Sequence, residues 1–311
     1  RPASARRPRP AGGSDAPPQT AVRNVGKGGI VWGGEVHRTA ASEIYPPYGI
    51  VAALLARDGI TPDFTSSGAF RYTHRTLPER EVYFVSNRAD LTVTETCVFR
   101  DGTGAAELWD AVTGEIRLLS GRVRTDRGLS LDIRLEPYQS CFIGVGGNGL
   151  AAGGEDAGIP DFPVYRTVMT IGGPWRVAFD PQWGGPERIA FDRLEDWTKR
   201  PEEGIRHYSG IAVYSRDFDL PGAESVSAGE RLFLDLGAVR EIARVRLNGQ
   251  DLGVVWTAPW RVEITGDVRP RQNRLEIEVA NLWPNRLIGD EEHPDDGVRE
   301  GRWPEWLLAG T

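Results

Sequence analysis

The most informative stretch of the sequence runs from residue 171 to residue 292. It opens with IGGPWRVAFDPQWGGP (171–186), continues through YSGIAVYSRDF (208–218) and RLNGQDLGVVW (246–256), and closes with ANLWPNRLIGDEE (280–292). Short runs within it alternate in polarity and are bounded by Gly, Pro, Asn or Asp, which is typical of half-buried β-strands. The pattern predicts a β-sandwich or jelly roll. The expected strands are 211–218, 231–236, 243–247, 261–264 and 274–280.

Two details support antiparallel pairing in this stretch. Asn248-Gly249 follows one predicted strand directly, and both residue types tolerate positive φ, so the dipeptide predicts a tight hairpin. In 274–280 the Leu, Ile and Val residues alternate with two Glu residues. One face of that strand should therefore pack in a core while the other faces water.

These blocks carry a resemblance to a known family. Together with DWT (196–198) and LDLG (234–237), they resemble the carboxy-terminal galactose-binding-like domain of large glycoside hydrolases. The similarity is greatest to the α-L-rhamnosidases of glycoside hydrolase family 106, and more distant to the sugar-binding domain of family 2 enzymes. It extends from Gly26 to Leu307, with NRLIGDE as its most specific block. The resemblance implies a catalytic barrel before this region and a closing strand after it, and we recognise neither in the sequence.

Length and composition limit the classes of function. A chain of 311 residues can form two or three domains. The net charge of -7 and the pI near 5.3 argue against a nucleic-acid partner. No run of apolar residues approaches the roughly 18 needed to span a membrane. The ten Trp residues suit loop-rich β domains with exposed aromatic side chains.

The fold class predicted from the whole sequence is mainly β, with two β-sandwiches preceded by a βα remnant of a larger α/β domain. Residues 1–25 are rich in Arg, Pro, Ala and Gly and are expected to be disordered. They lack the apolar run of a signal peptide. The predicted parts that follow are an α/β remnant (26–66), a small β-sandwich (67–145), a Gly-rich linker (146–160) and a galactose-binding-like jelly roll (161–311).

The predicted remnant consists of a strand over Gly28–Trp32 and a helix over Tyr48–Arg57. A lone βα unit cannot cover both apolar faces of its sheet, so residues such as Ile30 and Leu54 should be only partly covered. In the small sandwich, eight strands are expected between residues 71 and 145. Its segments EVYFVSNR (81–88) and ELWDAVTGEI (107–116) resemble the β domain that joins barrel and sugar-binding module in such glycosidases.

No metal or cofactor site is expected. The four His residues are scattered without neighbouring Cys or His, which does not match the spacing of metal ligands. Cys97 and Cys141 lie in strand-like runs far apart in the sequence. We interpret them as buried thiols, with a single bridge between neighbouring strands as the alternative.

Glycoside hydrolysis requires two Asp or Glu side chains placed across the scissile bond. The candidate pairs are Glu195-Asp196, Asp290-Glu291 and Asp295-Asp296. Residues that are adjacent on an extended segment point in opposite directions, and these pairs are interpreted as surface charges or as groups that fix loops. We therefore assign no catalytic residue.

Residues 285–291 are interpreted as a loop. In this interpretation Arg286, Asp290 and Glu291 frame Leu287-Ile288, so that the polar side chains tether the loop while the apolar pair plugs the core. The alternative is that the loop contacts substrate or a catalytic barrel.

Tryptophan is a common platform for sugars, because its wide apolar face stacks on the C–H face of a sugar ring. Trp183 lies in a Gly-Pro turn and Trp256 precedes Ala258-Pro259. These two are expected to be exposed and are candidates for carbohydrate binding, whereas Trp175 is expected in the core.

Three functions remain open from the sequence. The preferred one is the non-catalytic carboxy-terminal portion of a rhamnosidase-like glycoside hydrolase, a fragment whose partners are carbohydrate and the missing barrel of the same polypeptide. The alternatives are a free-standing, lectin-like carbohydrate-binding protein and a structural assembly module. The family resemblance implies an extracellular or periplasmic location.

Overall fold

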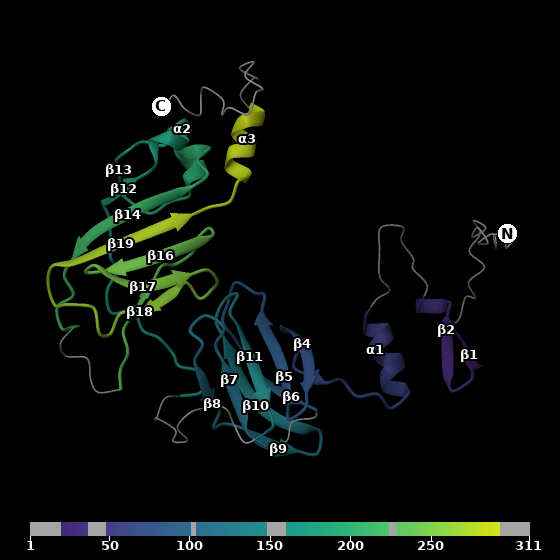
Figure 1. The fold of residues 1–311 in the computed structure, drawn as a ribbon. Coiled ribbons are helices and arrows are strands. Elements are labelled where there is room, and N and C mark those ends of the chain that lie inside the picture. The colour runs from purple at the N-terminus through teal and green to yellow at the C-terminus, as the bar shows by residue number, and fades with distance from the viewer. Residues whose placement is uncertain (1–19, 37–47, 101–103, 148–159, 224–228, 293–311) are drawn as a thin grey trace, which may run out of the picture. The chain divides into compact units, whose positions relative to one another are not determined.

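A computed structural model of the chain describes residues 20–36, 48–100, 104–147, 160–223 and 229–292 (Figure 1). It divides into two compact units, residues 1–63 and 64–311. Most of the regular structure is antiparallel sheet, which confirms the prediction of a mainly β protein with β-sandwiches.

The first unit contains a hairpin and a helix. β1 (Ala21–Val25) pairs with β2 (Gly28–Trp32), and the turn between them places Gly26 at φ 59°. A 3₁₀ helix η1 (Gly34–Val36) and the predicted helix α1 (Tyr48–Arg57) follow. The expectation of disorder was wrong for residues 21–25, because pairing with β2 satisfies the backbone of a segment with little to bury. Residues 1–19 lie outside the described part.

The apolar side chains of this unit are largely open to solvent. No residue of α1 is buried, and Ile30, Trp32 and Leu55 are 54%, 40% and 43% exposed. Ile50 and Leu54 are half-buried. The described residues of this unit therefore do not cover these side chains by themselves.

The first sandwich of the second unit consists of two sheets. The four-stranded sheet has the order β3-β6-β10-β9 and the five-stranded sheet the order β4-β5-β11-β7-β8. All eight predicted strands are present. The predicted start at residue 67 was too late, because β3 already pairs with β6. The strands are β3 (Phe64–Thr65), β4 (Phe70–Leu77), β5 (Arg80–Asn87), β6 (Val93–Phe99), β7 (Ala106–Trp109), β8 (Ile116–Leu118), β9 (Val123–Thr125), β10 (Gly128–Leu135) and β11 (Ser140–Val145).

The core between these sheets is built from every second residue of their strands. Tyr83, Phe99 and Ile143 are fully buried. Cys97 and Cys141 are free and buried, which confirms the thiol interpretation and rules out the bridge.

The second sandwich packs a six-stranded sheet, β13-β12-β14-β19-β16-β17, with the two-stranded sheet β15-β18. Its strands are β12 (Trp175–Ala178), β13 (Ile189–Phe191), β14 (Ile211–Phe218), β15 (Phe233–Asp235), β16 (Ile242–Leu247), β17 (Gln250–Val255), β18 (Arg261–Glu263) and β19 (Asn273–Ala280). Short helices lie between them and at the end: η2 (Pro181–Trp183), η3 (Trp197–Lys199), α2 (Glu203–Arg206) and α3 (Pro284–Glu292). The predicted hairpin joins β16 to β17, with φ of 55° at Asn248 and 85° at Gly249.

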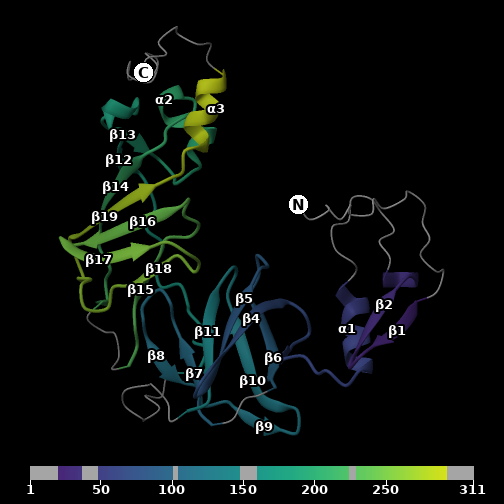
Figure 2. The same ribbon diagram turned by 45° about the vertical axis from the view of Figure 1, so that its right-hand side comes forward.

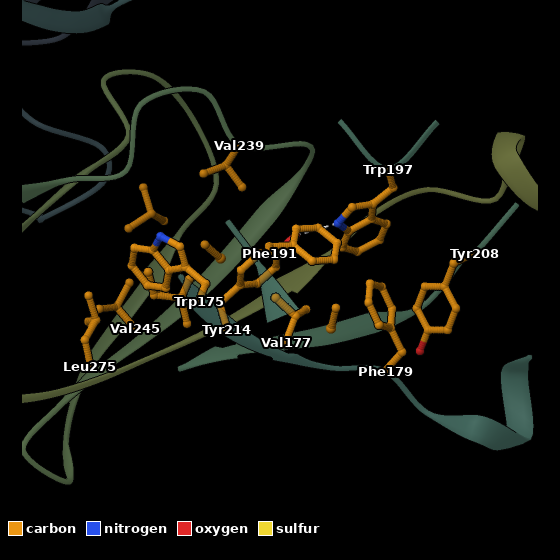
Figure 3. Close-up of a cluster of buried hydrophobic side chains, with 14 of the residues drawn as sticks. Trp175, Val177, Phe179, Phe191, Trp197, Tyr208, Tyr214, Val239, Val245 and Leu275 are labelled. Carbon is orange, nitrogen blue, oxygen red and sulfur yellow. Dashed lines mark hydrogen bonds between the residues drawn. The ribbon is translucent and has the colours of Figure 1, made fainter. Parts of the chain in front are cut away.

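Aromatic side chains fill the core of the second sandwich (Figure 3). Phe179 makes edge contacts with Trp197 and Tyr208 at ring distances of 5.3 and 4.9 Å. The Trp197 indole Nε1 donates to the Tyr214 hydroxyl at 2.5 Å. Trp175 is 4% exposed, which confirms its predicted core position.

The segment after the Gly-rich stretch belongs with the first sandwich. Asp161 accepts hydrogen bonds from the backbone N–H groups of Ser120 and Gly121, both at 2.9 Å, and Phe162 packs against the first core. The predicted boundary at residue 161 was therefore too early. Residues 148–159 of the predicted linker lie outside the described part.

Candidate functional site

Helix α3 brings together the polar residues singled out in the sequence. It follows β19 and lies at the end of the second sandwich, next to α2 (Figures 1 and 2). The interpretation of residues 285–291 as a loop was wrong. Pro284 stands at the first helical position, where its fixed φ and missing N–H are tolerated. Asp290 and Glu291 are thus neighbours on a helix, about 100° apart around its axis.

Arg286 anchors this helix to the sandwich. Arg286 is only 2% exposed. The guanidinium Nη2 donates to the Trp183 carbonyl at 2.7 Å, and the backbone N–H donates to Ser209 Oγ at 3.1 Å. Burial lowers the pKa of Arg286, and the nearby charge of Asp290 opposes that shift. A buried cation that donates to a main-chain carbonyl is a structural tether.

Gly289 lets the helix approach the sandwich closely. A Cβ built on Gly289 would lie 2.8 Å from both Cβ and Cγ of His207. His207 is itself 3% exposed, and its Nε2 lies 3.5 Å from the carboxylate of Glu292 at the end of α3. Arg286 and Gly289 are three positions apart and therefore share the inward face.

The segment that leads into α3 is fixed by side-chain hydrogen bonds to the backbone. Asn281 accepts from the Gly210 N–H at 2.9 Å and donates to the Tyr208 carbonyl at 2.8 Å. Ser209 Oγ donates to the Leu282 carbonyl at 3.0 Å. These bonds hold the start of α3 on the loop between α2 and β14.

The other side of this region is apolar and faces outward. Leu282 is 58% exposed, Trp283 52%, Leu287 62% and Ile288 49%. We call these four residues the α3 outer face. The prediction that Leu287-Ile288 plugs the core was wrong, because the helix turns Arg286 and Gly289 inward instead.

The two candidate tryptophans differ in exposure. Trp183 is half-buried, packs against the core and contacts Trp283 edge-on at a ring distance of 6.1 Å. Asp180 caps its short helix by accepting from the Gln182 N–H at 2.9 Å. Trp256 directly follows β17 and is 53% exposed. Of the two, Trp256 has the more open indole.

The other candidate carboxylates have structural partners. Glu195 pairs with Arg200 at 2.8 Å, and Arg200 also pairs with Glu202 at 2.7 Å. These bonds raise the pKa of Arg200 and lower that of Glu202. Asp196 accepts from the Thr198 N–H at 3.0 Å and so caps η3. Asp295 and Asp296 lie outside the described residues.

The described residues contain neither a cluster of metal ligands nor a membrane-spanning helix. In those segments no group of three or more His, Cys, Asp or Glu side chains could hold a metal ion. None of the described helices is long and apolar enough to cross a membrane.

Comparison with known proteins links the chain to carbohydrate-active enzymes. Residues 13–122 match the family model for alpha-L-rhamnosidase, glycoside hydrolase 106. Residues 204–304 match the model for the galactose-binding-like domain of glycosyl hydrolase 2. The predicted resemblance is therefore confirmed, with the rhamnosidase match on the amino-terminal part and the galactose-binding-like match on the part that contains α3.

Two individual proteins extend this result. A rhamnosidase structure from Novosphingobium sp. PP1Y is 34% identical with a TM-score of 0.63, over 83% of this chain and 24% of that one. A putative beta-glucuronidase of Formosa agariphila is 41% identical over 147 residues, which is 46% of this chain and 13% of the relative. The chain thus spans a quarter or less of the length of the proteins it matches.

Proposed function

We propose that this chain is a non-catalytic carboxy-terminal portion of a rhamnosidase-like glycoside hydrolase that acts on plant or microbial polysaccharide outside the cytoplasm. In this role it supports the catalytic barrel of the same polypeptide and contributes contacts to sugar. Both family matches and the rhamnosidase structure support this assignment.

The observation that carries the proposal is the orientation of α3. The helix is seated by a buried Arg286 and a close-packed Gly289, whereas its longest apolar side chains point outward. A helix whose outer side faces solvent normally shows the opposite arrangement, with its apolar stripe packed against the core. Exposed, contiguous apolar side chains are typical of a surface that packs on another protein part. We infer that the α3 outer face packs against the barrel.

The carboxylates support a non-catalytic role. An acid and its partner carboxylate must face each other across a substrate. Glu195 and Asp196 are instead held by Arg200 and by the start of η3, and Asp290 and Glu291 lie exposed on α3. In the resembling family, the acid and base belong to the barrel.

The gene itself provides the test. Sequencing upstream of the codon for Arg1 should reveal an in-frame barrel domain. In the longer protein, amide hydrogen exchange of α3 should be slower than in the 311-residue chain, because packing protects it. An in-frame stop codon upstream, or equal exchange in both proteins, would contradict the proposal.

A matched pair of variants tests the surface in the chain as it stands. Leu287→Ser with Ile288→Ser should lower binding of an anilinonaphthalene dye while the melting temperature stays the same. Val168→Ser removes a side chain of similar exposure, 55%, outside the α3 outer face, and should change neither. Unchanged dye binding in the double variant would argue against an open apolar surface.

A free-standing carbohydrate-binding protein is the second candidate, favoured by the open indole of Trp256. Under that function, Trp256→Ala would abolish retention of the chain by a polysaccharide while leaving it folded. If the chain is a module for assembly alone, which is the third candidate, the polysaccharide should retain neither the parent chain nor the Trp256→Ala variant.

A further inference from the structure

The two outer faces of the first sandwich differ in character. On the four-stranded sheet most outward positions are polar, such as Thr96, whose Oγ1 donates to Asp132 at 2.6 Å, although Val98 and Val123 also lie on this face. On the five-stranded sheet, register places one residue from each strand in a single outward row, and three of the five are aromatic. The row is Thr73, Phe84, Phe142, Trp109 and Ile116.

This row faces away from the core. Its three aromatic members alternate along their strands with buried residues, among them Val85, Cys141 and Leu108. Phe84 and Phe142 lie in contact, with ring centroids 5.1 Å apart. Neighbouring strands are about 4.8 Å apart, so a row across five strands is about 19 Å long. That length suits an extended chain better than a compact ligand.

Trp109 is held in one orientation. Its indole Nε1 donates to Glu107 Oε2 at 3.0 Å, and Glu107 is only 1% exposed. Arg80 pairs with the same carboxylate at 3.1 Å. A side chain with both its indole N–H and its supporting carboxylate fixed loses little conformational entropy when a ligand stacks on it.

Gly144 provides the space in which the indole lies. A Cβ on this residue would be 2.8 Å from Trp109 Cζ2 and 2.9 Å from Cε2. The indole therefore lies over the backbone of β11, at the outward position of Gly144. Any larger residue would displace it.

The neighbouring strand β4 adds positive charge. Arg71 and Arg75 flank Thr73 on the outward side, and both are exposed. The outward residues of β5 are Arg80, Val82, Phe84 and Ser86. The outward residues of these two strands thus include three arginines, of which Arg80 is already paired with Glu107 of the same face.

We propose that this surface, which we call the aromatic platform (Phe84, Phe142, Trp109, Arg71 and Arg75), binds an acidic polysaccharide. A sugar ring stacks on the aromatic row, as apolar sugar faces do on indole. Carboxylates of uronic acid residues pair with Arg71 and Arg75, since guanidinium groups suit carboxylates geometrically. A purely apolar partner would desolvate both arginines without compensation. The platform lies on a different sandwich from α3, so the inference does not depend on the proposed function.

The test uses affinity electrophoresis of the 311-residue chain through gels that contain polygalacturonate, at about 0.15 M salt so that distant charges are screened. The acidic polymer should retard the chain, and its fully methyl-esterified form should not. Arg71→Gln with Arg75→Gln should weaken retardation about tenfold, the effect of losing two exposed charge pairs. Arg127→Gln, at an exposed turn position outside the platform, should leave it unchanged.

A second variant tests the stacking. Trp109→Ala should also weaken retardation, and its circular dichroism melt shows whether the sandwich stays folded. If Trp109→Ala does not fold, the double variant Arg71→Gln with Arg75→Gln still tests whether the platform binds the acidic polymer.

Three results of the electrophoresis would overturn the inference. They are no retardation by polygalacturonate, equal retardation by the esterified polymer, and equal loss in Arg127→Gln. Concentration-dependent sedimentation that Ile116→Ser abolishes would show that a second copy of the chain occupies the face instead, and would also overturn it. None of these results bears on whether the chain hydrolyses glycosides, so failure here is distinct from failure of the proposed function.

Discussion

Arg286 shows how a charged residue can occupy a position that usually takes an apolar one. Arginine is rarely buried unless its donors find partners. Here Nη2 reaches the Trp183 carbonyl, and the backbone N–H of the same residue reaches Ser209. The polar tether predicted for this block is consistent with that geometry. The predicted burial of Leu287-Ile288 is not consistent with it, although the sequence pattern favoured both the tether and the burial.

Replacing Arg286 tests the tether. Arg286→Met keeps an apolar stem but leaves the Trp183 carbonyl without this donor, so the free energy of unfolding should fall by about 2 kcal/mol. Leu287→Ser, at the neighbouring exposed position, should change it by about 0.5 kcal/mol or less. Urea unfolding followed by tryptophan fluorescence measures both. A larger loss for Leu287→Ser would mean that the apolar pair, and not Arg286, holds the helix.

The two cysteines should be inert while the protein is folded. Burial raises the pKa of both Cys97 and Cys141 to about 12. A thiol with a raised pKa stays protonated at pH 8, and only the thiolate reacts rapidly. Ellman's reagent at pH 8 should therefore modify both thiols only after denaturation. Rapid reaction of the folded chain would contradict their burial.

At the scale of elements, the strands were largely predictable and the last helix was not. Alternating polarity predicted all eight strands between residues 71 and 145 because each has one buried face. It missed β1, β3, β12 and β13, which are only two to five residues long. The hairpin predicted at Asn248-Gly249 implies a strand at β17, but Gly253 at φ 94° interrupts the alternation there, so no bounds were predicted for it. Helix α3 turns an Arg and a Gly inward, the reverse of the periodicity by which helices are recognised.

The seating of α3 can be tested at Gly289. Gly289→Ala places a methyl group against the His207 ring, where the available distance is 2.8 Å. Overpacking of this kind costs about 1–3 kcal/mol of stability. Gly266→Ala is the control, because nothing lies within 4 Å of its Cβ position. If both variants unfold at the same urea concentration as the parent, α3 does not pack as described.

For the whole molecule, composition predicted that two sandwiches exist, but the boundary between them depends on contacts between distant residues. The sequence predicted that Asp161 and Phe162 begin the second sandwich, but in the structure both contact the first sandwich. The two sandwiches also meet through an ion pair between Arg261 and Glu136 at 3.0 Å. Such long-range contacts leave no local pattern in the sequence.

Limited proteolysis tests the predicted joint. The Gly-rich residues 146–158 offer little to bury, so cleavage should occur there first and leave two resistant fragments. The downstream fragment should keep the second sandwich intact. First cleavage within residues 243–279 would show that the division into two sandwiches is wrong.

We propose that this chain supports catalysis without performing it, and an activity assay on the purified chain is the sharpest test of that role. The purified chain should show no turnover of aryl α-L-rhamnosides or aryl galactosides, because the candidate carboxylates among the described residues are held by Arg200 and η3 or lie exposed on α3. Turnover that is abolished by one Asp or Glu substitution, such as Glu195→Gln or Asp290→Asn, would contradict the account.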